Sequence, residues 1–185
     1  MEESFVIAIA GGSASGKSTL AEALCAHLRT FTSCDHVAMD RHMRRTDELA
    51  PHFLFSFTGE RTFNANDPES VDNLAVLAVV EASDAQVVIV DGLMALASEE
   101  IRSRAALKVF VDLDADIRAV RRVERDIRTG RSGGDPALIA AYYLECARIG
   151  HEKYVQPSKA FADLIVRGDA SLDRTVELLS RLVPR

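Results

Sequence analysis

Short apolar runs alternate with segments of helical periodicity along almost the whole chain. Runs such as FVIAIA and VVIV contain no polar residue, as expected of strands that are buried on both faces of a parallel sheet. Strands are expected at 5–10, 36–39, 87–90, 107–111 and 161–166. Amphipathic helices are expected at 17–29, 70–82, 115–128, 136–152 and 172–182. This alternation predicts an α/β fold, a three-layer α/β/α sandwich around a mainly parallel five-stranded sheet.

Several of the expected strands end at chemically useful residues. In an open parallel sheet, ligands bind beyond the carboxyl ends of the strands. Four of these ends fall at Gly11, Asp40, Asp91 and Asp112, so three of the four carry an acid. No linker or repeat interrupts the pattern, and residues 1–185 are expected to form a single domain. The least regular stretches, 41–67 and 129–135, are expected to be mobile loops.

Charge and composition exclude several classes of protein. The net charge of −6 makes non-specific binding of nucleic acid or of an anionic membrane unfavourable. No apolar stretch approaches the ~20 residues that a membrane helix needs. Glu2 and Glu3 precede the first apolar run, where a secretory signal would carry positive charge. The three cysteines have neither disulfide-framework nor zinc-ligand spacing. We therefore expect a cytoplasmic protein without a nucleic-acid or membrane partner.

The segment from Gly11 to Ser18 matches the phosphate-binding pattern G-x-x-x-x-G-K-[ST] and lies between an expected strand and an expected helix. Glycines let backbone N–H groups turn toward a phosphate, and the helix N-terminus adds partial positive charge. Lys17 can reach the β- and γ-phosphates, and the Ser18 hydroxyl can hold Mg²⁺. The pattern predicts a P-loop nucleotide-binding fold, with ATP bound by Gly11, Gly12, Ser13, Ala14, Ser15, Gly16, Lys17, Ser18 and Thr19.

A second magnesium-binding residue is expected at Asp91, which follows the run VVIV. A carboxylate after a buried strand is placed as a Walker-B acid is, to hold Mg²⁺ through water. The alternative is that Asp91 caps a turn with Gly92. No Asn-Lys-x-Asp stretch is present to read a guanine base, which disfavours a Ras-like GTPase.

Six arginines fall within fourteen residues, with Glu124 and Asp126 among them. Most of them recur at helical spacing, and glycines follow at 130, 133 and 134. This combination predicts a closing lid, at about 125–136, that brings guanidinium groups over a transferred phosphoryl group. The alternative is a solvated helix face whose arginines pair with the two acids. The arginines expected to act in catalysis are Arg122, Arg125 and Arg131.

Asp40 follows the second expected strand, across the site from the phosphate loop. A carboxylate at this place could accept the proton of an acceptor hydroxyl as it attacks the γ-phosphate. The alternative is a helix or turn cap. Spacing alone does not choose between the two.

These motifs together resemble the uridine kinase/phosphoribulokinase group of P-loop kinases, over nearly the whole chain. The loop GGSASGKST is similar to the uridine kinase phosphate loop, and VVIVDGL is similar to an apolar strand that ends in Glu-Gly-Ile in the family. The other segments that carry the resemblance are 64–72, 110–131 and 152–163.

The resemblance implies ATP-dependent phosphorylation of a hydroxyl, typically the 5′-hydroxyl of a nucleoside. It implies that Asp40 is the base and that Lys17 and Mg²⁺ act on the phosphates. The lid arginines of the family correspond to Arg122, Arg125, Arg128 and Arg131, with one residue missing near Thr129.

The chain departs from the family pattern in the part that reads the acceptor. Asp40 is followed by Arg-His-Met instead of an aromatic pair, and Asp91 replaces a Glu. The nucleoside-binding hairpin between the Asn64 segment and the Asp91 strand is expected to be missing, because one helix fills that interval. The segment 40–72 is expected to supply the acceptor site instead. It contains Phe53, Phe55, Phe57 and Phe63 among several basic residues, which could line a pocket for a ring-shaped ligand. The alternative is that the alternating Phe53, Phe55 and Phe57 pack one face of an edge strand.

Three functions stay open at this stage. The first is a kinase for a nucleoside. The second is a kinase of the same build for nicotinamide riboside, a pantothenate-like compound or a sugar. The third is a non-catalytic regulatory protein that binds ATP. The sequence does not determine the oligomeric state, and a homo-oligomer is compatible with it.

Overall fold

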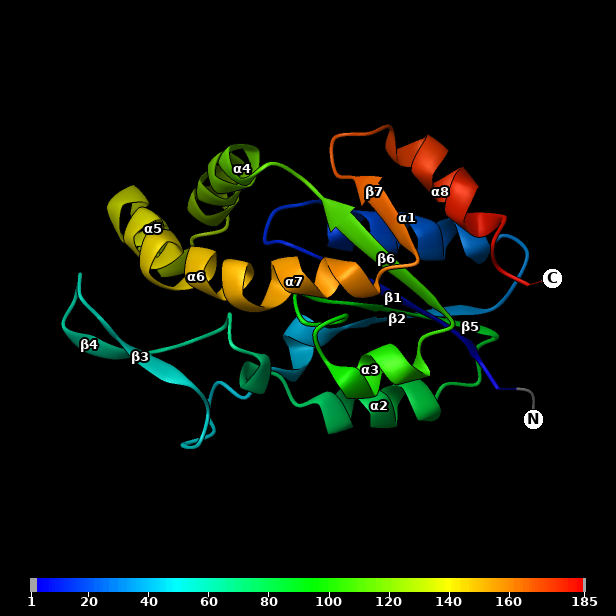
Figure 1. Cartoon of the computed structure of the whole chain (residues 1–185), viewed down its shortest axis with the longest axis horizontal. Helices are drawn as coiled ribbons and strands as arrows, with labels where there is room; N and C mark the ends of the chain where they lie inside the picture. Colours follow the sequence, from blue (N-terminus) through cyan, green and yellow to red (C-terminus); the bar gives the residue numbers. More distant parts are fainter. Residues whose placement is uncertain (1–2, 185) are drawn as a thin grey trace.

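A computed structural model describes residues 3–184 and contains the expected parallel sheet. Five parallel strands lie in the order β2–β5–β1–β6–β7 (Figure 1). Their bounds are β1 Phe5–Gly11, β2 Cys34–Ala38, β5 Val87–Asp91, β6 Leu107–Asp112 and β7 Leu164–Arg167. The predicted architecture is confirmed. The second strand begins two residues earlier than predicted and ends one residue earlier, and the fifth begins three residues later and ends one residue later.

Helices cover both faces of the sheet, and the strand sequences explain why. Successive side chains of a strand point to opposite faces, so a strand covered on both sides needs apolar residues throughout. Alternate residues of β1 pack against α2 (Asn73–Glu81) and α3 (Glu99–Arg104) on one face. The intervening residues, Ile7 and Ile9, pack with α1 (Lys17–Leu28) and α8 (Leu172–Ser180) on the other.

Helix α3 was not predicted, because six residues are too few for helical periodicity to show. It begins after Ser98, whose hydroxyl accepts a hydrogen bond from the Ile101 N–H. Helix α2 begins three residues later than predicted, after the cap Asp72, and Pro68–Ser70 form a separate 3₁₀ turn.

Helix α4 (Ala115–Arg128) follows the carboxyl end of β6 and has the predicted bounds. A 3₁₀ turn at Arg131–Gly134 comes after it. A long helical run then extends to Phe161, nine residues beyond the predicted end at Glu152. It consists of α5 (Pro136–Tyr142), α6 (Arg148–Gly150) and α7 (Gln156–Ser158), with π-helical turns between them and a final 3₁₀ turn, Lys159–Phe161.

A separate antiparallel hairpin forms within the stretch 41–67, which was predicted to be a mobile loop. Its strands are β3 (His52–Phe55) and β4 (Glu60–Phe63). The ring of Tyr142 in α5 lies against Phe53 and Phe55, with centroids 5.7 and 6.1 Å apart. The alternation of Phe53 and Phe55 indicated an edge strand, and both residues lie in β3. The pairing with β4 was not predicted, because the surface on which the hairpin packs belongs to a helix some eighty residues away.

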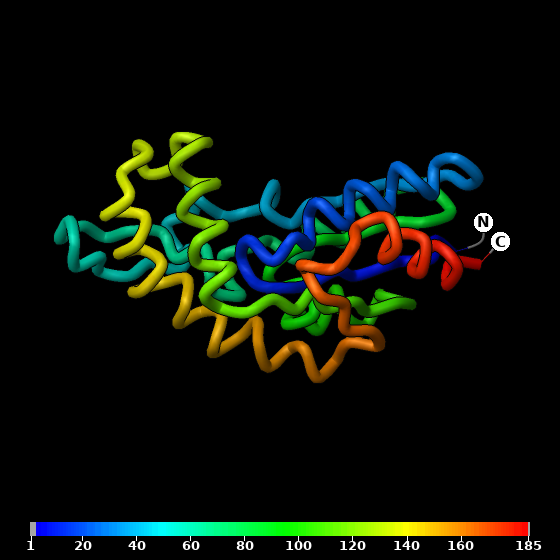
Figure 2. The backbone as a smooth tube through the Cα atoms, turned by 90° about the horizontal axis from the view of Figure 1, so that it is seen from above, coloured from blue at the N-terminus to red at the C-terminus, as the bar shows by residue number. Residues whose placement is uncertain are grey.

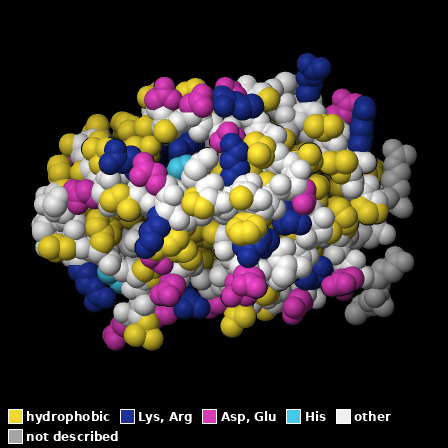
Figure 3. Space-filling model, viewed as in Figure 1, with side chains coloured by type: hydrophobic (Ala, Val, Ile, Leu, Met, Phe, Trp, Pro, Cys, Tyr) yellow, Lys and Arg dark blue, Asp and Glu magenta, His cyan; other side chains and the backbone are white. Residues whose placement is uncertain are grey.

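The molecule is elongated, with the hairpin, α4 and α5 at one end and both termini at the other (Figures 1 and 2). Apolar side chains also reach the surface at the hairpin end (Figure 3). The exposed residues of these segments include Leu49, Leu54, Phe57, Leu144 and Ile149. Within residues 3–184, no helix combines the length and the apolar character needed to cross a bilayer.

Gly150 makes a close contact that fixes the long helical run against the segment 64–72. A Cβ atom at Gly150 would overlap the backbone oxygen of Asn66, which is itself buried. Alanine normally stabilises a helix interior by about 1 kcal/mol relative to glycine. We expect Gly150→Ala instead to lower the free energy of unfolding by about 1–3 kcal/mol, because the backbone of one segment must shift. Urea unfolding measures this, and an equally or more stable variant would contradict the contact.

Candidate active site

The loop between β1 and α1 provides an N-terminus that no side chain caps. Gly16 lies at the N-cap of α1 with φ +98°, a conformation that favours glycine, and its neighbour Ala14 has φ +62°. The first turn of α1 contains no acidic residue and receives no side-chain hydrogen bond. In contrast, α2, α3, α5 and α8 are each capped by a side chain. The first N–H groups of α1 are therefore free to bind an anion.

Neighbouring segments touch the backbone of this loop directly. A Cβ atom at Gly12 would lie 2.6 Å from Nη1 of Arg118, and one at Gly168 would overlap the backbone oxygen of Ser15. The buried Arg118 side chain is held in place by a hydrogen bond from its Nε to the oxygen of Leu113, 3.0 Å away. Sequence reasoning assigned neither Arg118 nor Gly168 to the site, although Arg118 shares the helical spacing of Arg122 and Arg125.

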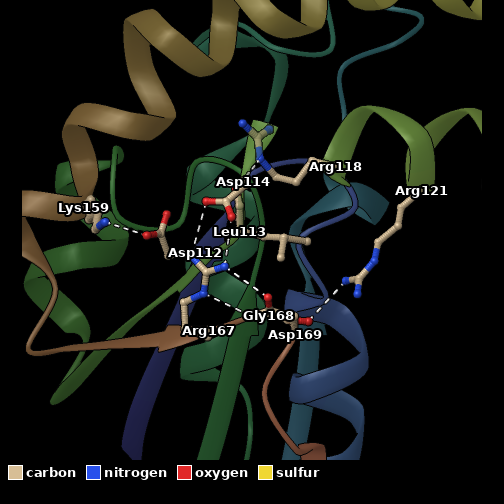
Figure 4. A network of polar contacts seen from close by, with 9 residues as sticks. All are labelled: Asp112, Leu113, Asp114, Arg118, Arg121, Lys159, Arg167, Gly168 and Asp169. Carbon is tan, nitrogen blue, oxygen red and sulfur yellow. Dashed lines mark hydrogen bonds and ion pairs between the residues drawn. The ribbon is translucent and has the colours of Figure 1, made fainter. Parts of the chain in front are cut away.

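A polar network links the carboxyl ends of β6 and β7 next to the loop (Figure 4). Arg167 donates to both carboxylate oxygens of Asp114, at 3.3 and 3.1 Å, and also bonds Asp169. These charge-assisted bonds raise the pKa of Arg167 and lower the pKa of Asp114. Arg121 of α4 donates to the oxygen of Gly168 at 3.2 Å. The base of α4 is thereby joined to the segment that contacts Ser15.

The predicted magnesium-binding residues lie together. The Ser18 hydroxyl donates to Oδ2 of Asp91 at 2.6 Å, and Nε2 of His36 in β2 lies 2.6 Å from Oδ1. Burial alone would raise the pKa of Asp91, but the hydrogen bonds from His36 and Ser18 and the charge of Lys17 lower it below its ordinary value. The sequence analysis did not assign His36 to the site, because nothing in the pattern of a short strand distinguishes it from any other strand residue.

The predicted site residues meet around the ammonium group of Lys17, which is buried. Burial lowers the pKa of Lys17, and the negative charges of Asp40 and Asp91 oppose this effect. The positive charges of Arg125 and Arg122 lower it further. All four groups act electrostatically on Lys17, the first residue of α1. They come from the turn after β2, from the end of β5 and from α4.

Asp40 is solvent-exposed and follows β2 in a 3₁₀ turn, Met39–His42. The observed strand β2 ends at Ala38, two residues before Asp40, whereas the predicted strand extended to residue 39. Its carboxylate acts on the Lys17 charge but has no hydrogen-bond or ion-pair partner among residues 3–184. An exposed carboxylate beside the phosphate loop remains available to a ligand.

The lid arginines converge on the buried carboxylate of Asp126. Arg125 lies 2.8 Å from Oδ1, Arg122 lies 3.4 Å from Oδ2, and Arg131 lies 3.8 Å from Oδ1. The Nη2 atom of Arg125 also reaches Oγ of Ser13 in the phosphate loop, at 3.5 Å. All three arginines therefore pair with an acid of their own segment, as the alternative to a lid predicted. Arg125 also contacts the phosphate loop. Arg131 is the most exposed of the three.

The aromatic residues of the segment 40–72 pack mainly on one another. Phe55 is buried between Phe53, Phe57 and Tyr142. Arg122 extends over the Tyr142 ring, with its guanidinium carbon 5.6 Å from the ring centre. Between Asp72 and Val87 the chain forms only α2 and a turn, so no hairpin is present there.

The donor set limits how a cation could be held. Residues 3–184 contain no group of three or more His, Cys, Asp and Glu side chains able to bind a metal ion. Ser18 and Asp91 contribute a hydroxyl and a carboxylate, which suit Mg²⁺ when phosphate oxygens and water complete its shell. The site can accordingly bind a polyphosphate at the N-terminus of α1, with a cation on one side and Asp40 on the other.

Known proteins similar to this chain are phosphotransferases. The family model of the phosphoribulokinase/uridine kinase family matches residues 78–172. A uridine kinase from Chloroflexus aggregans is 30% identical, over 88% of this chain and 86% of its own length. A uridine kinase from Lactobacillus johnsonii is 25% identical over 95% and 92% of the two chains. The crystal structure of shikimate kinase from Bacteroides thetaiotaomicron matches with a TM-score of 0.58 at 20% identity, covering 96% and 97% of the two chains.

The cluster around Asp126 makes a prediction about stability. Asp126→Asn removes the charge that three guanidinium groups share in a buried position, so we expect the free energy of unfolding to fall by about 3 kcal/mol. Glu124→Gln, on the exposed side of the same helix, is the matched control and should change it by less than about 0.5 kcal/mol. Denaturant unfolding of the three proteins measures both. Equal effects of the two substitutions would contradict a special role for Asp126.

His151, in the long helical run, makes a prediction about pH. Burial and the nearby charge of Arg118 lower its pKa to about 4, and its buried Nδ1 has no hydrogen-bond partner among residues 3–184. Between pH 6.5 and about 4 the unfolded chain takes up a proton that the folded chain does not, so stability falls as the pH falls through this range. We expect the free energy of unfolding of His151→Gln to fall by about 2 kcal/mol less than that of the wild type between pH 7 and pH 4.5. Urea unfolding at both pH values tests this, and equal losses would contradict it.

Proposed function

The chain belongs to the phosphoribulokinase/uridine kinase family, and on that premise we propose that it transfers the γ-phosphate of ATP to a hydroxyl group of a nucleoside. The observation that carries the proposal is the geometry at the phosphate loop, where Ser18 bonds Asp91 at 2.6 Å and Arg125 reaches Ser13 at 3.5 Å. The charges of Asp40 and Asp91 also act on the buried Lys17 ammonium beside them. A kinase needs these parts in one place, because phosphoryl transfer depends on positioning and on charge stabilisation.

Two features of the loop fit the phosphates of ATP. The N-terminus of α1 has unpartnered N–H groups and no cap that competes for them. The Ser15 hydroxyl is buried beside Gly11 and makes no hydrogen bond within residues 3–184. Buried polar atoms rarely lack a partner, and a phosphate oxygen would supply one. Lys17 then binds the β- and γ-phosphates, and the other residues of the stretch 11–19 surround them.

Ser18 and Asp91 are the proposed magnesium-binding residues. Their oxygen atoms already lie within hydrogen-bonding distance, so both can face one cation or its water ligands. When bound, Mg²⁺ supplies charge neutralisation at the β- and γ-phosphate oxygens. The low pKa of Asp91 keeps its carboxylate charged at neutral pH, as this role requires.

Asp40 is the proposed base. As the acceptor oxygen forms its bond to the γ-phosphorus, the bond from that phosphorus to the β,γ-bridging oxygen breaks and ADP leaves. The acceptor proton passes to the Asp40 carboxylate. Arg125, which already contacts Ser13, is the lid arginine best situated to stabilise the charge of the transferred group, and Arg122 and Arg131 support it.

The acceptor is proposed to be a nucleoside bound between Asp40 and the hairpin of β3 and β4. The absence of a hairpin between Asp72 and Val87 favours a second candidate, a kinase of the same build that acts on nicotinamide riboside, a sugar or a pantothenate-like alcohol. Both candidates use the same phosphate loop, base and lid.

A panel of acceptors separates these functions. ADP release from Mg-ATP is measured with uridine, cytidine, nicotinamide riboside, pantothenate and sugars, with an acceptor-free control for ATP hydrolysis. Mass spectrometry of the product identifies the phosphorylated compound. Stimulation by uridine or cytidine supports the nucleoside kinase, and stimulation by another compound alone supports the second candidate. ATP binding without transfer to any compound of the panel would exclude these compounds as acceptors and favour a regulatory protein.

Asp40→Asn tests the proposed base. We expect the variant to bind ATP with unchanged affinity while kcat for acceptor phosphorylation falls by about 10²–10⁴-fold, because the amide cannot take up the proton. Asp84→Asn, an exposed acid remote from the loop, is the matched control. Turnover of Asp40→Asn near the wild-type rate would eliminate Asp40 as the base, whatever the acceptor proves to be.

A further inference from the structure

Asp91 uses both of its carboxylate oxygens inside the protein. One accepts from Ser18, and the other lies 2.6 Å from Nε2 of His36. A carboxylate only accepts hydrogen bonds, so Nε2 carries the hydrogen in this contact. The Asp91 side chain is only 3% exposed and that of His36 17%, so water is largely excluded from the pair.

The strands determine the direction from which His36 approaches. β2 pairs with β5 in parallel register, with His36 opposite Ile89 and Ala38 opposite Asp91. His36 therefore lies two positions before the end of its strand, and its ring extends along the sheet toward the carboxylate. Ser18 approaches from the first turn of α1. The two donors come from different elements of the fold, and together they fix the plane of a group that otherwise has a broad torsional preference.

We propose that His36 is a positioning residue of the nucleotide site: it holds the Asp91 carboxylate so that its second oxygen faces Ser18 and the pair is prearranged for Mg²⁺. The proposal rests on the proposed function, since it assumes that Mg-ATP binds at this loop. Hydrogen-bond partners behind a metal-binding residue commonly change metal affinity by about 10–100-fold when they are removed.

The alternative is that His36 only ties β2 to β5. In that case a ring of the same size without the donor would lower stability but would leave the magnesium dependence of ATP binding unchanged. The two roles therefore differ in a binding measurement that does not involve turnover.

The experiment measures binding of a fluorescent ATP analogue as a function of Mg²⁺ concentration, and again in EDTA. His36→Phe keeps the ring and removes the donor, and His36→Gln keeps an N–H donor at the end of a flexible side chain. We expect His36→Phe to raise the half-saturating Mg²⁺ concentration by about tenfold while binding in EDTA stays within about twofold. His36→Gln should recover most of the loss. His27→Phe, on the exposed side of α1, is the matched control.

A second arm tests whether His36 acts through Asp91. In an Asp91→Asn background, His36→Phe should change the half-saturating Mg²⁺ concentration by less than about twofold, because the group that it positions is no longer a carboxylate. An equal effect of His36→Phe in both backgrounds would overturn the proposal, as would wild-type magnesium dependence of the single variant. Those results leave the proposed function intact. Binding of the analogue by the wild type that does not respond to Mg²⁺ at all would overturn the proposed function, and this proposal with it.

Discussion

The loop between β1 and α1 is packed so closely that other segments touch its backbone as well as its side chains. Gly12 lies against the guanidinium group of Arg118, and the backbone oxygen of Ser15 lies against Gly168. The conformation of the loop therefore depends on β6, α4 and β7 as well as on its own glycines. The ion pairs of Arg167 and Lys159 near the ends of β6 and β7 keep those supporting segments together (Figure 4). An anion site made of backbone N–H groups is useful only when the backbone is held in this way.

Charge is distributed around the loop in two different ways. Asp91 and Asp126 are buried, and each has several donors. Asp40 is exposed and has none among the described residues. A buried carboxylate is retained only when it is well paired, so the orientation of Asp91 and Asp126 is set by their donors. An exposed carboxylate such as Asp40 is free to reorient toward a ligand. The proposed roles agree with this difference: Asp91 is a prearranged magnesium-binding residue, and Asp40 meets the acceptor.

The end of the molecule that carries the hairpin is organised by aromatic packing. Phe53 and Phe55 lie against Tyr142, and Arg122 extends over the same ring. The lid helix and the hairpin therefore share one cluster, although they are distant in sequence. This shared cluster joins the proposed acceptor side of the molecule to the helix that carries the proposed lid arginines.

The sequence by itself determined the five strands of the parallel sheet and the main helices along the chain, and it predicted the phosphate loop and the acids at Asp40 and Asp91. Each of these depends on residues that are adjacent or regularly spaced, such as VVIV before Asp91 or the glycines around Lys17, and local spacing is what a sequence displays. The tertiary structure alone decided the rest. His36 meets Asp91 across two strands, Arg118 meets Gly12, three arginines share Asp126, and the hairpin packs on Tyr142. Two reasons account for this: such contacts depend on how elements far apart in the chain pack together, and a histidine within a short strand has the same local sequence whether or not a carboxylate lies beside it.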